Sequence, residues 1–510
     1  MDSRRNQLSS GIILSYLANI LQILITVFYM PVMLRLLGKS EYGIYQMAYS
    51  TISYLTLFTF GFSSAYIKFY ASSVILPNGK QEVARLNGLF LSIFTALGIL
   101  VLVVGAFLSF HSDQVLGGKL TQEELDTGRI LMWILVINAF FHFPQIVFNN
   151  YIIAKERFIC LQSINLFSII LNPVLTFPLL LMGFRSIGLA LVLLLISFGK
   201  LAVSAWYCFR RLDIPFSFHK IPFSLLRSVS AFSFYLFLDT LASMVNISLD
   251  RYLLGKLVGS AAVAVYSVGG QINTLYVSLS TSISSVFTPR VNNLVAADAG
   301  REVLSRIFLR VGKLQYGVLL LVLSGFLLFG RRFILLWVGE GYEAAFGVAS
   351  VLMASYTVDL IQNSAIQIQR AKGLQKYRSR FMFLIALMNI VISLVLIRRY
   401  HEFGAALGTA IANMIGAGFV MNWFYARRVG LDIKRFWKEM LCMTRACIPL
   451  VLYGLLIYKR LMSCSLVLYL LFGLIFLVLY GASMYLLGLR EEDRESLKAG
   501  LRSRFPARRK

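Results

Sequence analysis

Polar side chains recur at helical spacing inside long apolar stretches of this 510-residue chain. Residues three and four positions apart share one face of a helix. Because polar groups that face hydrocarbon are costly, such faces are expected to line protein or a water-filled cavity. Hydrogen bonding that only holds helices together is the alternative. Four polar faces of this kind are Ser15, Asn19, Gln22 and Thr26; Asn138, His142, Gln145 and Asn149; Asp239, Ser243, Asn246 and Asp250; and Ser355, Asp359, Asn363 and Gln367.

Charged residues inside the apolar stretches are candidates for ion and anion binding. Asp239 and Asp359 lie near the middle of their stretches, where a carboxylate is protonated, paired or bound to a cation. A structural partnership remains the alternative for both acids. Lys200 and Lys68 could attract an anion, or could extend their ammonium groups toward the membrane surface. The candidate ion-coupling residues, for Na⁺ or H⁺, are Asp239, Asp359, Asp250 and Asn363.

The other candidate cavity residues are uncharged or lie at the ends of apolar stretches. His142 precedes Phe143-Pro144 and could instead be a hydrogen-bonded part of a kink. Arg251 and Arg290 could instead be topological anchors at the membrane boundary. The full set of candidate substrate-binding residues is Lys68, Lys200, Arg290, Gln22, Asn19, His142, Gln145, Asn246 and Arg251.

Composition predicts that membrane-spanning helices position these residues. Hydrophobic residues make up 58% of the chain and charged residues 14%, and the mean hydropathy is +0.74, whereas a soluble domain has about 25% charged residues. About fourteen stretches of roughly 18–27 residues are long enough to cross a hydrocarbon core of ~30 Å. We predict an all-α polytopic membrane protein with spans at 9–34, 42–72, 84–110, 129–152, 158–182, 186–209, 228–250, 261–288, 307–330, 345–369, 379–397, 403–426, 441–458 and 465–487.

An offset of 217 residues relates two halves of the chain. The tetrapeptide LLGK begins at Leu36 and again at Leu253, and the same offset carries Asn172 onto Asn389. Such repeats are typical of two-lobed membrane transporters. We predict two pseudo-symmetric lobes of six helices each, followed by two further helices. The predicted boundaries are 1–213 for the first lobe, 214–430 for the second with an interfacial linker at 214–227, and 431–510 for spans 13 and 14 with a basic tail.

The net charge of +26 is explained by membrane topology and not by nucleic acid. With the N-terminus in the cytoplasm, 34 of the 49 Lys and Arg residues fall on the cytoplasmic side and 13 on the outer side. This asymmetry follows the positive-inside rule and places both termini in the cytoplasm. The five cysteines show no paired spacing and are expected to be core residues.

Motifs for ATP, metal and common hydrolytic chemistry are missing from the sequence. Gly38-Lys39-Ser40 resembles the end of a P-loop, but Met33 occupies the position of its first glycine. HExxH, paired CxxC, GxSxG and GxGxxG are absent, so no cofactor or metal is predicted. A membrane glycosyltransferase or polymerase is the enzymatic alternative, and it would depend on the outer-loop acids Glu124 and Asp126.

Several segments together resemble the polysaccharide-exporter (Wzx-like) branch of the multidrug/oligosaccharidyl-lipid/polysaccharide (MOP) superfamily, to which the MATE transporters also belong. They are LSSGIILSYLANILQILITVFYMPVMLRLLGKSEYGIYQMAYS at the start, GFSSAYIKFYAS at 61–72, DRYLLGKLVGSAAVAVYSVGGQI at 250–272, and AKGLQKYRSRFMFLIALMNIVISLVLI at 371–397 followed by GAALGTAIANMIG. The resemblance covers nearly the whole chain. It transfers a role by motif only to Lys68 and Asp250-Arg251.

The resemblance implies a flippase that moves undecaprenyl-pyrophosphate-linked oligosaccharide across the bacterial cytoplasmic membrane by alternating access. Because no ATPase motif is present, we expect the energy to come from an ion gradient, the membrane potential or the substrate gradient. Implied partners are the lipid-linked oligosaccharide, membrane lipids, and polysaccharide polymerase or assembly proteins. A multidrug or small-molecule antiporter of the same superfamily is the alternative, although the lysines inside spans argue against a cavity for cations. The glycan, the coupling ion and the oligomeric state stay open.

Overall fold

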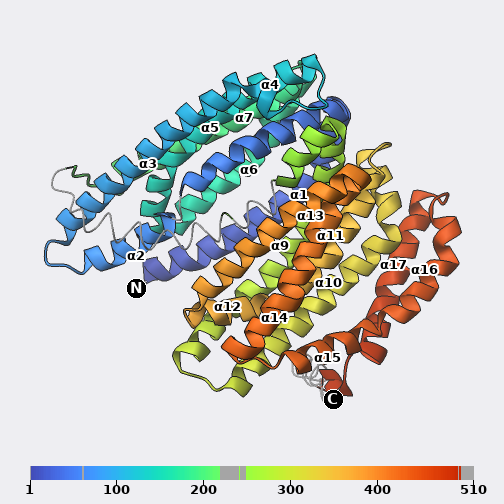
Figure 1. The fold of residues 1–510 in the computed structure, drawn as a ribbon. Coiled ribbons are helices and arrows are strands. Elements are labelled where there is room, and N and C mark those ends of the chain that lie inside the picture. The colour runs from blue at the N-terminus through green and yellow to red at the C-terminus, as the bar shows by residue number, and fades with distance from the viewer. Residues whose placement is uncertain (1, 60–61, 219–240, 242–248, 492, 496–510) are drawn as a thin grey trace, which may run out of the picture. The chain divides into compact units, whose positions relative to one another are not determined.

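The computed structural model describes residues 2–59, 62–218, 241, 249–491 and 493–495, and the elements assigned there are all helical (Figure 1). The chain packs as two compact units, one of Met1–Val268 with Met382–Gly408 and the other of Gly269–Phe381 with Thr409–Lys510. The predicted lobe boundaries at 213 and 430 remain predictions. Predicted span 7, with Asp239 and Asn246, lies largely outside the described residues, as does most of the 214–227 linker.

The first unit is a bundle of long helices. Helices α3, α5 and α7 pack side by side, and α1 packs on α5 and α6 (Figure 1). Gly105 of α3 lies against Val136 of α5, so the absence of a side chain lets these helices approach closely. The elements of this unit are α1 (Asp2–Ser53), η1 (Tyr54–Thr59), α2 (Phe62–Val74), α3 (Gly79–Phe110), α4 (Ser112–Val115), α5 (Gln122–Ala154), α6 (Phe158–Leu181), α7 (Arg185–Arg210), the beginning of α9 (Ser260–Ala296) and the middle of α13 (Gln375–Asn413).

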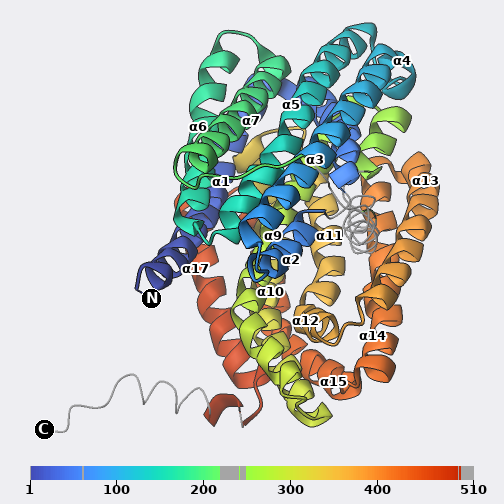
Figure 2. The ribbon, with the colours of Figure 1, turned by 90° about the vertical axis from the view of Figure 1, so that its left-hand side faces the viewer.

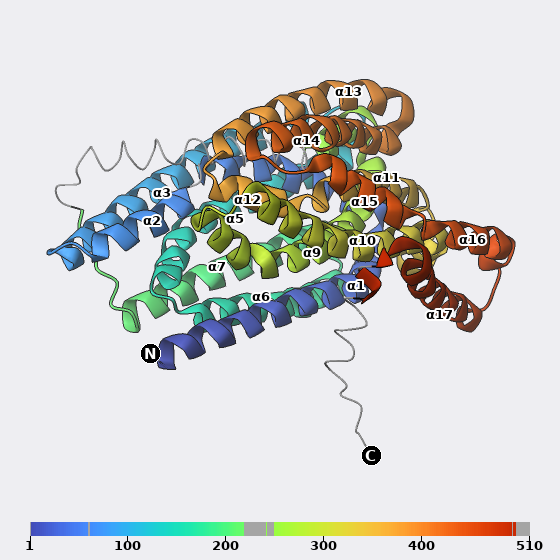
Figure 3. The same ribbon diagram turned by 90° about the horizontal axis from the view of Figure 1, so that it is seen from below.

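The second unit is built around α10. Helix α15 lies against the first half of α10 (Figure 2). The rings of Phe308 and Phe436 stack there with their centroids 4.2 Å apart. Helices α16 and α17 form a hairpin (Figure 3). A buried cluster of Leu320, Leu450, Phe476 and Tyr480 joins α10 to this hairpin. Its elements are the rest of α9, α10 (Arg301–Val338), α11 (Ala344–Leu360), α12 (Asn363–Ala371), parts of α13 (Gln375–Asn413), η2 (Met414–Val420), α14 (Met421–Phe424), η3 (Tyr425–Val429), α15 (Ile433–Thr444), α16 (Cys447–Leu461), α17 (Leu466–Ser483) and η4 (Met484–Gly488).

Breaks inside two very long helices separate predicted spans. The backbone of α1 turns at Gly38 (φ 77°, ψ 173°), between spans 1 and 2. Helix α13 turns at His401 (φ 52°, ψ −130°), between spans 11 and 12. Among the described residues, nine helices, or ten with the bent α11–α12 pair, are long and apolar enough to cross a membrane. The polytopic all-helical prediction is confirmed, and the count of fourteen stays a prediction.

The helix surfaces carry the apolar side chains expected of residues in contact with lipid. Leu456 of α16 is 81% exposed and Val467 of α17 is 78% exposed, although both are strongly hydrophobic. Contiguous apolar surfaces of this size mark an interface with membrane or protein. Their position on helices of spanning length indicates contact with acyl chains.

Candidate functional site

The structure brings three predicted residues of the first unit together. His142 and Gln145 of α5 form a side-chain hydrogen bond, and the ammonium group of Lys200, on α7, lies within electrostatic range of the His142 ring. Gln145 is buried, Lys200 is half-buried and His142 is exposed. The grouping arises because α5 and α7 pack along their length and the polar face of α5 turns toward α7. We call His142, Gln145 and Lys200 the α5–α7 cluster.

Ser204 extends the α5–α7 cluster and was not predicted. Its hydroxyl donates to Asn149 Oδ1 over 3.1 Å, one turn of α5 beyond Gln145. Ser204 lies four residues after Lys200 and therefore on the same face of α7. That spacing was visible in the sequence. A Lys and a Ser on α7 thus face an imidazole and two amides on α5, which can together bind an anion and the hydroxyl groups attached to it.

The polar residues of α1 and α2 are open to their surroundings. Asn19 and Gln22 are exposed, and Gln22 Nε2 lies 3.4 Å from Thr26 Oγ1, one turn along α1. Lys68 is exposed on α2, with its ammonium 5.9 Å from the centroid of the Phe69 ring. These three side chains are exposed on their helices, and they stay candidates for contact with a substrate.

Asp250 has a defined structural partner. Its carboxylate is 1% exposed and accepts a hydrogen bond of 2.7 Å from the Tyr266 hydroxyl. Arg251 lies within electrostatic range of Tyr42 and Tyr54. A buried carboxylate that is bound by a hydroxyl is well suited to hold helices together. These contacts favour the structural role for Asp250 over ion coupling.

Glu124, which lies in the first turn of α5, joins three segments of the first unit. It accepts hydrogen bonds from the hydroxyl of Ser40 over 2.6 Å, from the hydroxyl of Ser260, and from the backbone N–H of Thr121 over 2.9 Å. Thr121 and Glu124 also form a capping box at the start of α5. A carboxylate with this many donors is held in place as an acceptor. Its role in the structure is to fasten the α5 N-terminus, which argues against the enzymatic alternative.

A second polar group lies in the second unit, between α9, α10 and α12. Gln315 Nε2 donates to Ser280 Oγ over 2.8 Å, and Asn363 Nδ2 lies 3.5 Å from the same hydroxyl. Gln315 is fully buried, so this group cross-links helices. Asn363 is half-buried at its margin. Arg290, the other candidate on α9, is exposed.

Asp359 lies at a break in predicted span 10. The expected continuous stripe from Ser355 to Gln367 is wrong, because α11 ends at Leu360 and α12 begins at Asn363 with a bend of 40°. The break is stabilised by Gln362, whose amide donates to the Val358 carbonyl over 2.7 Å. Asp359 and Asn363 therefore do not share one helical face.

Arg378 is the charged neighbour of Asp359 and was not predicted. Its side chain is 9% exposed, lies within electrostatic range of Asp359, and hydrogen bonds to the Tyr425 hydroxyl. The prediction missed it because Arg378 falls between spans 10 and 11, where arginine usually reflects topology. Discontinuous membrane helices commonly border substrate and ion sites, which keeps Asp359 a candidate for coupling.

Polar and charged side chains of these groups lie on helices that are long and apolar enough to cross a membrane. Within the described ranges, no three His, Cys, Asp or Glu residues are placed to hold a metal ion. The arrangement defines a polytopic membrane protein with polar groups carried on its spanning helices.

Comparison with known proteins identifies the family. The model of the family described as "Polysaccharide biosynthesis protein" matches residues 8–295. The chain is 21% identical over 401 residues to a "Putative O-antigen transporter" of Shigella flexneri, covering 77% of this chain and 91% of that protein. It is 23% identical over 446 residues to the "Uncharacterized membrane protein EpsK" of Bacillus subtilis, covering 83% and 84%. The chain belongs to the polysaccharide biosynthesis protein family.

Solved structures bear out the predicted fold. A lipid II flippase MurJ in an inward closed conformation superposes with a TM-score of 0.72 at 16% identity, covering 93% of this chain and 97% of that one. An inward-facing MATE multidrug transporter of the MOP superfamily superposes with a TM-score of 0.65 at 15% identity, covering 82% and 99%. These structures confirm the predicted MOP-type fold, and the family match over residues 8–295 confirms the polysaccharide branch.

Proposed function

We propose that this protein is a flippase for undecaprenyl-pyrophosphate-linked oligosaccharide in the bacterial cytoplasmic membrane, with both termini in the cytoplasm. The observation that carries the proposal is the polysaccharide biosynthesis family match over residues 8–295, more than half of the chain. The MurJ-like fold supports it, because that architecture is compatible with moving a lipid-linked headgroup.

The α5–α7 cluster is the proposed binding site for the headgroup in the first unit. The Lys200 ammonium offsets pyrophosphate charge, and a half-buried ammonium does this more effectively than one in bulk water. The amides of Gln145 and Asn149 and the His142 ring hydrogen bond to sugar hydroxyls. Lys68, Asn19 and Gln22 offer further contacts along the route. The apolar prenyl chain stays in lipid during transport.

Energy for the cycle is proposed to come from an ion gradient or the membrane potential. A cation that binds one conformation more tightly than the other biases the equilibrium between them. Asp359 is the described acid best placed for this, because it lies at a helix break beside a residue that can pair with it. Asp239 remains a second candidate.

The test is a flipping assay in proteoliposomes. A fluorescently tagged undecaprenyl-pyrophosphate glycan is reconstituted with the protein, and a quencher outside the vesicles reports which leaflet holds the tag. Protein-dependent movement between leaflets that is lost in Lys200→Gln supports the proposal. Failure to move several different glycans, together with export of a lipophilic cation by the same vesicles, would instead support the antiporter.

A further inference from the structure

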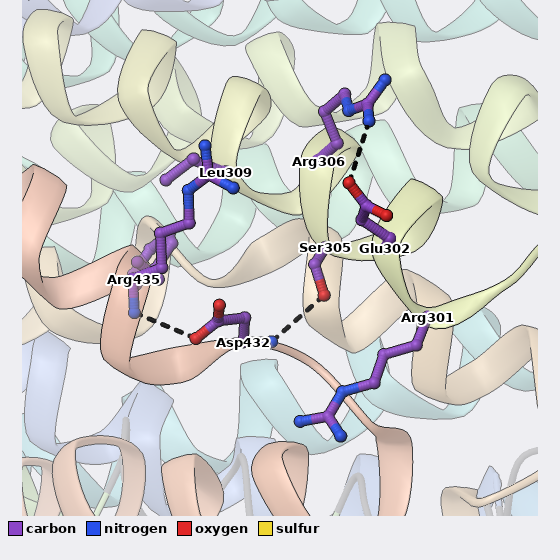
Figure 4. A pocket seen from close by; sticks show the side chains of 8 residues that line it. Arg301, Glu302, Ser305, Arg306, Leu309, Asp432 and Arg435 are labelled. Atoms are coloured by element: carbon purple, nitrogen blue, oxygen red, sulfur yellow. Dashed lines mark hydrogen bonds and ion pairs between the residues drawn. The ribbon is translucent and has the colours of Figure 1, made fainter.

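A basic pocket lies in the second unit between the first turns of α10 and the start of α15, remote in sequence from the α5–α7 cluster. It has a volume of about 300 Å³, which is at the lower end of ligand-sized pockets. Arg301 and Arg306 come from α10 and Arg435 from α15, so three guanidinium groups surround it (Figure 4). We call it the α10–α15 pocket.

The carboxylates of the pocket are already engaged. Glu302 pairs with Arg306 at 3.2 Å, one turn along α10. Asp432 caps α15 by accepting the backbone N–H of Arg435 over 3.0 Å, and its own N–H donates to Ser305 Oγ over 3.1 Å (Figure 4). The pocket carries a net positive charge, since three arginines face two acids.

Two of the pocket arginines have no acid of the described residues within ion-pair distance. Among the residues that the structure describes, the guanidinium groups of Arg301 and Arg435 form no salt bridge. The Ser305 hydroxyl accepts from Asp432 and keeps its own proton to donate. Planar guanidinium groups with an added hydroxyl donor suit the oxygens of a phosphate.

The surface of α15 indicates that the pocket borders the membrane. Phe436 and Met440 are buried against the second unit, whereas Leu441 is 67% exposed and Trp437 half-buried on another face. Lys434 and Lys438 are exposed beside them. A helix with an outward apolar face, a tryptophan and flanking lysines is typical of the membrane interface. Only two residues separate α15 from the apolar helix α16.

We propose that the α10–α15 pocket binds the phosphate of an anionic phospholipid from the cytoplasmic leaflet. Arg301 and Arg435 contact the phosphate oxygens, and Leu309 and Phe436 provide an apolar wall beside the glycerol. The pocket lies among residues outside the family match over 8–295, and the lipid acts as a bound structural ligand and not as cargo. Anionic lipid therefore stabilises the α10–α15 junction.

The test compares two variants of the full-length protein that lose the same charge. Arg301→Gln with Arg435→Gln removes the unpaired pocket arginines, and Lys434→Gln with Lys438→Gln removes two exposed charges of the same helix. Thermal unfolding in detergent is measured with added phosphatidylglycerol, phosphatidylcholine or inorganic phosphate. We expect phosphatidylglycerol alone to raise the midpoint of the wild type and of the lysine variant. Losing two charge-assisted contacts is expected to weaken the lipid effect about tenfold or more in the arginine variant.

Three outcomes would overturn the assignment. Equal losses in both variants would mean that a diffuse basic surface attracts the lipid. An equal shift with inorganic phosphate would identify a free anion as the ligand, and an equal shift with phosphatidylcholine would remove the requirement for charge. If the arginine variant is misfolded, Arg301→Lys with Arg435→Lys replaces it. That variant keeps the charge but loses the planar fork, so we expect a reduced lipid shift. A full lipid shift in that variant would contradict recognition by guanidinium geometry.

Discussion

At the scale of single residues, Lys200 distinguishes an anion-binding role from one in helix packing. Lys200→Gln keeps the length and polarity of the side chain and removes its charge. We expect the rate of flipping to fall by about tenfold to hundredfold, the effect of one charged hydrogen bond. The measurement is the initial rate in proteoliposomes with matched protein content.

Charge and geometry at this position are separated by a conservative substitution. Lys200→Arg keeps the positive charge and is expected to retain most of the rate. Lys80→Gln, at an exposed lysine near the start of α3, is the control for loss of charge alone. A normal rate in Lys200→Gln would remove this residue from the headgroup site.

Glu439 shows how charge stabilises the second unit. Its carboxylate is 3% exposed and binds Lys313 Nζ at 2.9 Å and Arg490 at 2.6 Å, while Asp493 binds Lys313 at 2.7 Å. Removing one member of a buried ionic network costs about 3 kcal/mol, because the remaining charges lose their partners. We expect Glu439→Gln to lower the thermal midpoint and to speed proteolysis after η4. Glu340→Gln, at an exposed carboxylate outside the α10–α15 pocket, is the control and should change little.

At the scale of elements, the backbone turn at Gly38 connects two predicted spans. Its φ of 77° and ψ of 173° lie in a region that essentially only glycine adopts. A Cβ there would meet no atom within 4 Å, so any effect of Gly38→Ala comes from the backbone alone. We expect a destabilisation of about 1–3 kcal/mol, seen as a lower thermal midpoint.

The matched control for Gly38 is a helical glycine with equal space around it. Gly481 of α17 also has no atom within 4 Å of a built Cβ, and Ala is favoured over Gly in helices by about 1 kcal/mol. Gly481→Ala should therefore be neutral or stabilising. If both variants behave alike, backbone strain at Gly38 is not what separates the spans.

The lengths of the apolar stretches predicted the ends of the spans well where a glycine marked the turn between two of them. The break at Gly38 falls between predicted spans 1 and 2 because glycine permits the required φ. The break at Ile361–Gln362 could not be predicted in the same way, since neither Gly nor Pro is present and a Gln side chain satisfies the freed carbonyl. The repeat offset also relates Gly43 to Ser260, whose backbone carbonyl group occupies the space that a side chain at position 43 would need. That contact depends on tertiary packing.

For the candidate site residues, the sequence predicted which of them share a helical face but not which residues of other helices they meet. Periodicity placed His142 and Gln145 on one face of α5, but their pairing with Lys200 depends on how α5 packs on α7. No sequence pattern indicated that Arg378 lies near Asp359, because the two residues are 19 positions apart and lie on either side of a helix break. A sequence pattern can show which side chains avoid lipid, and packing decides which of them meet.

At the scale of the whole molecule, a gradient can drive transport only if an ion binds one state more tightly than another. Asp359 is the described acid that we propose for this role. We expect Asp359→Asn to keep downhill flipping and to lose its acceleration by an imposed proton or sodium gradient. The control is Asp298→Asn, because Asp298 is exposed and has φ 48°, a conformation that Asn also adopts readily.

A second variant at the neighbouring Arg378 distinguishes a coupling role of Asp359 from a structural one. If Asp359 only balances a buried cation, Asp359→Asn leaves Arg378 without compensation and destabilises the protein. The double variant Asp359→Asn with Arg378→Gln removes both charges and should restore stability in either case. A purely structural pair then predicts a normal gradient response in the double variant. A coupling role predicts a stable protein that flips its substrate downhill and ignores the gradient, because the ion has lost the carboxylate to which it bound.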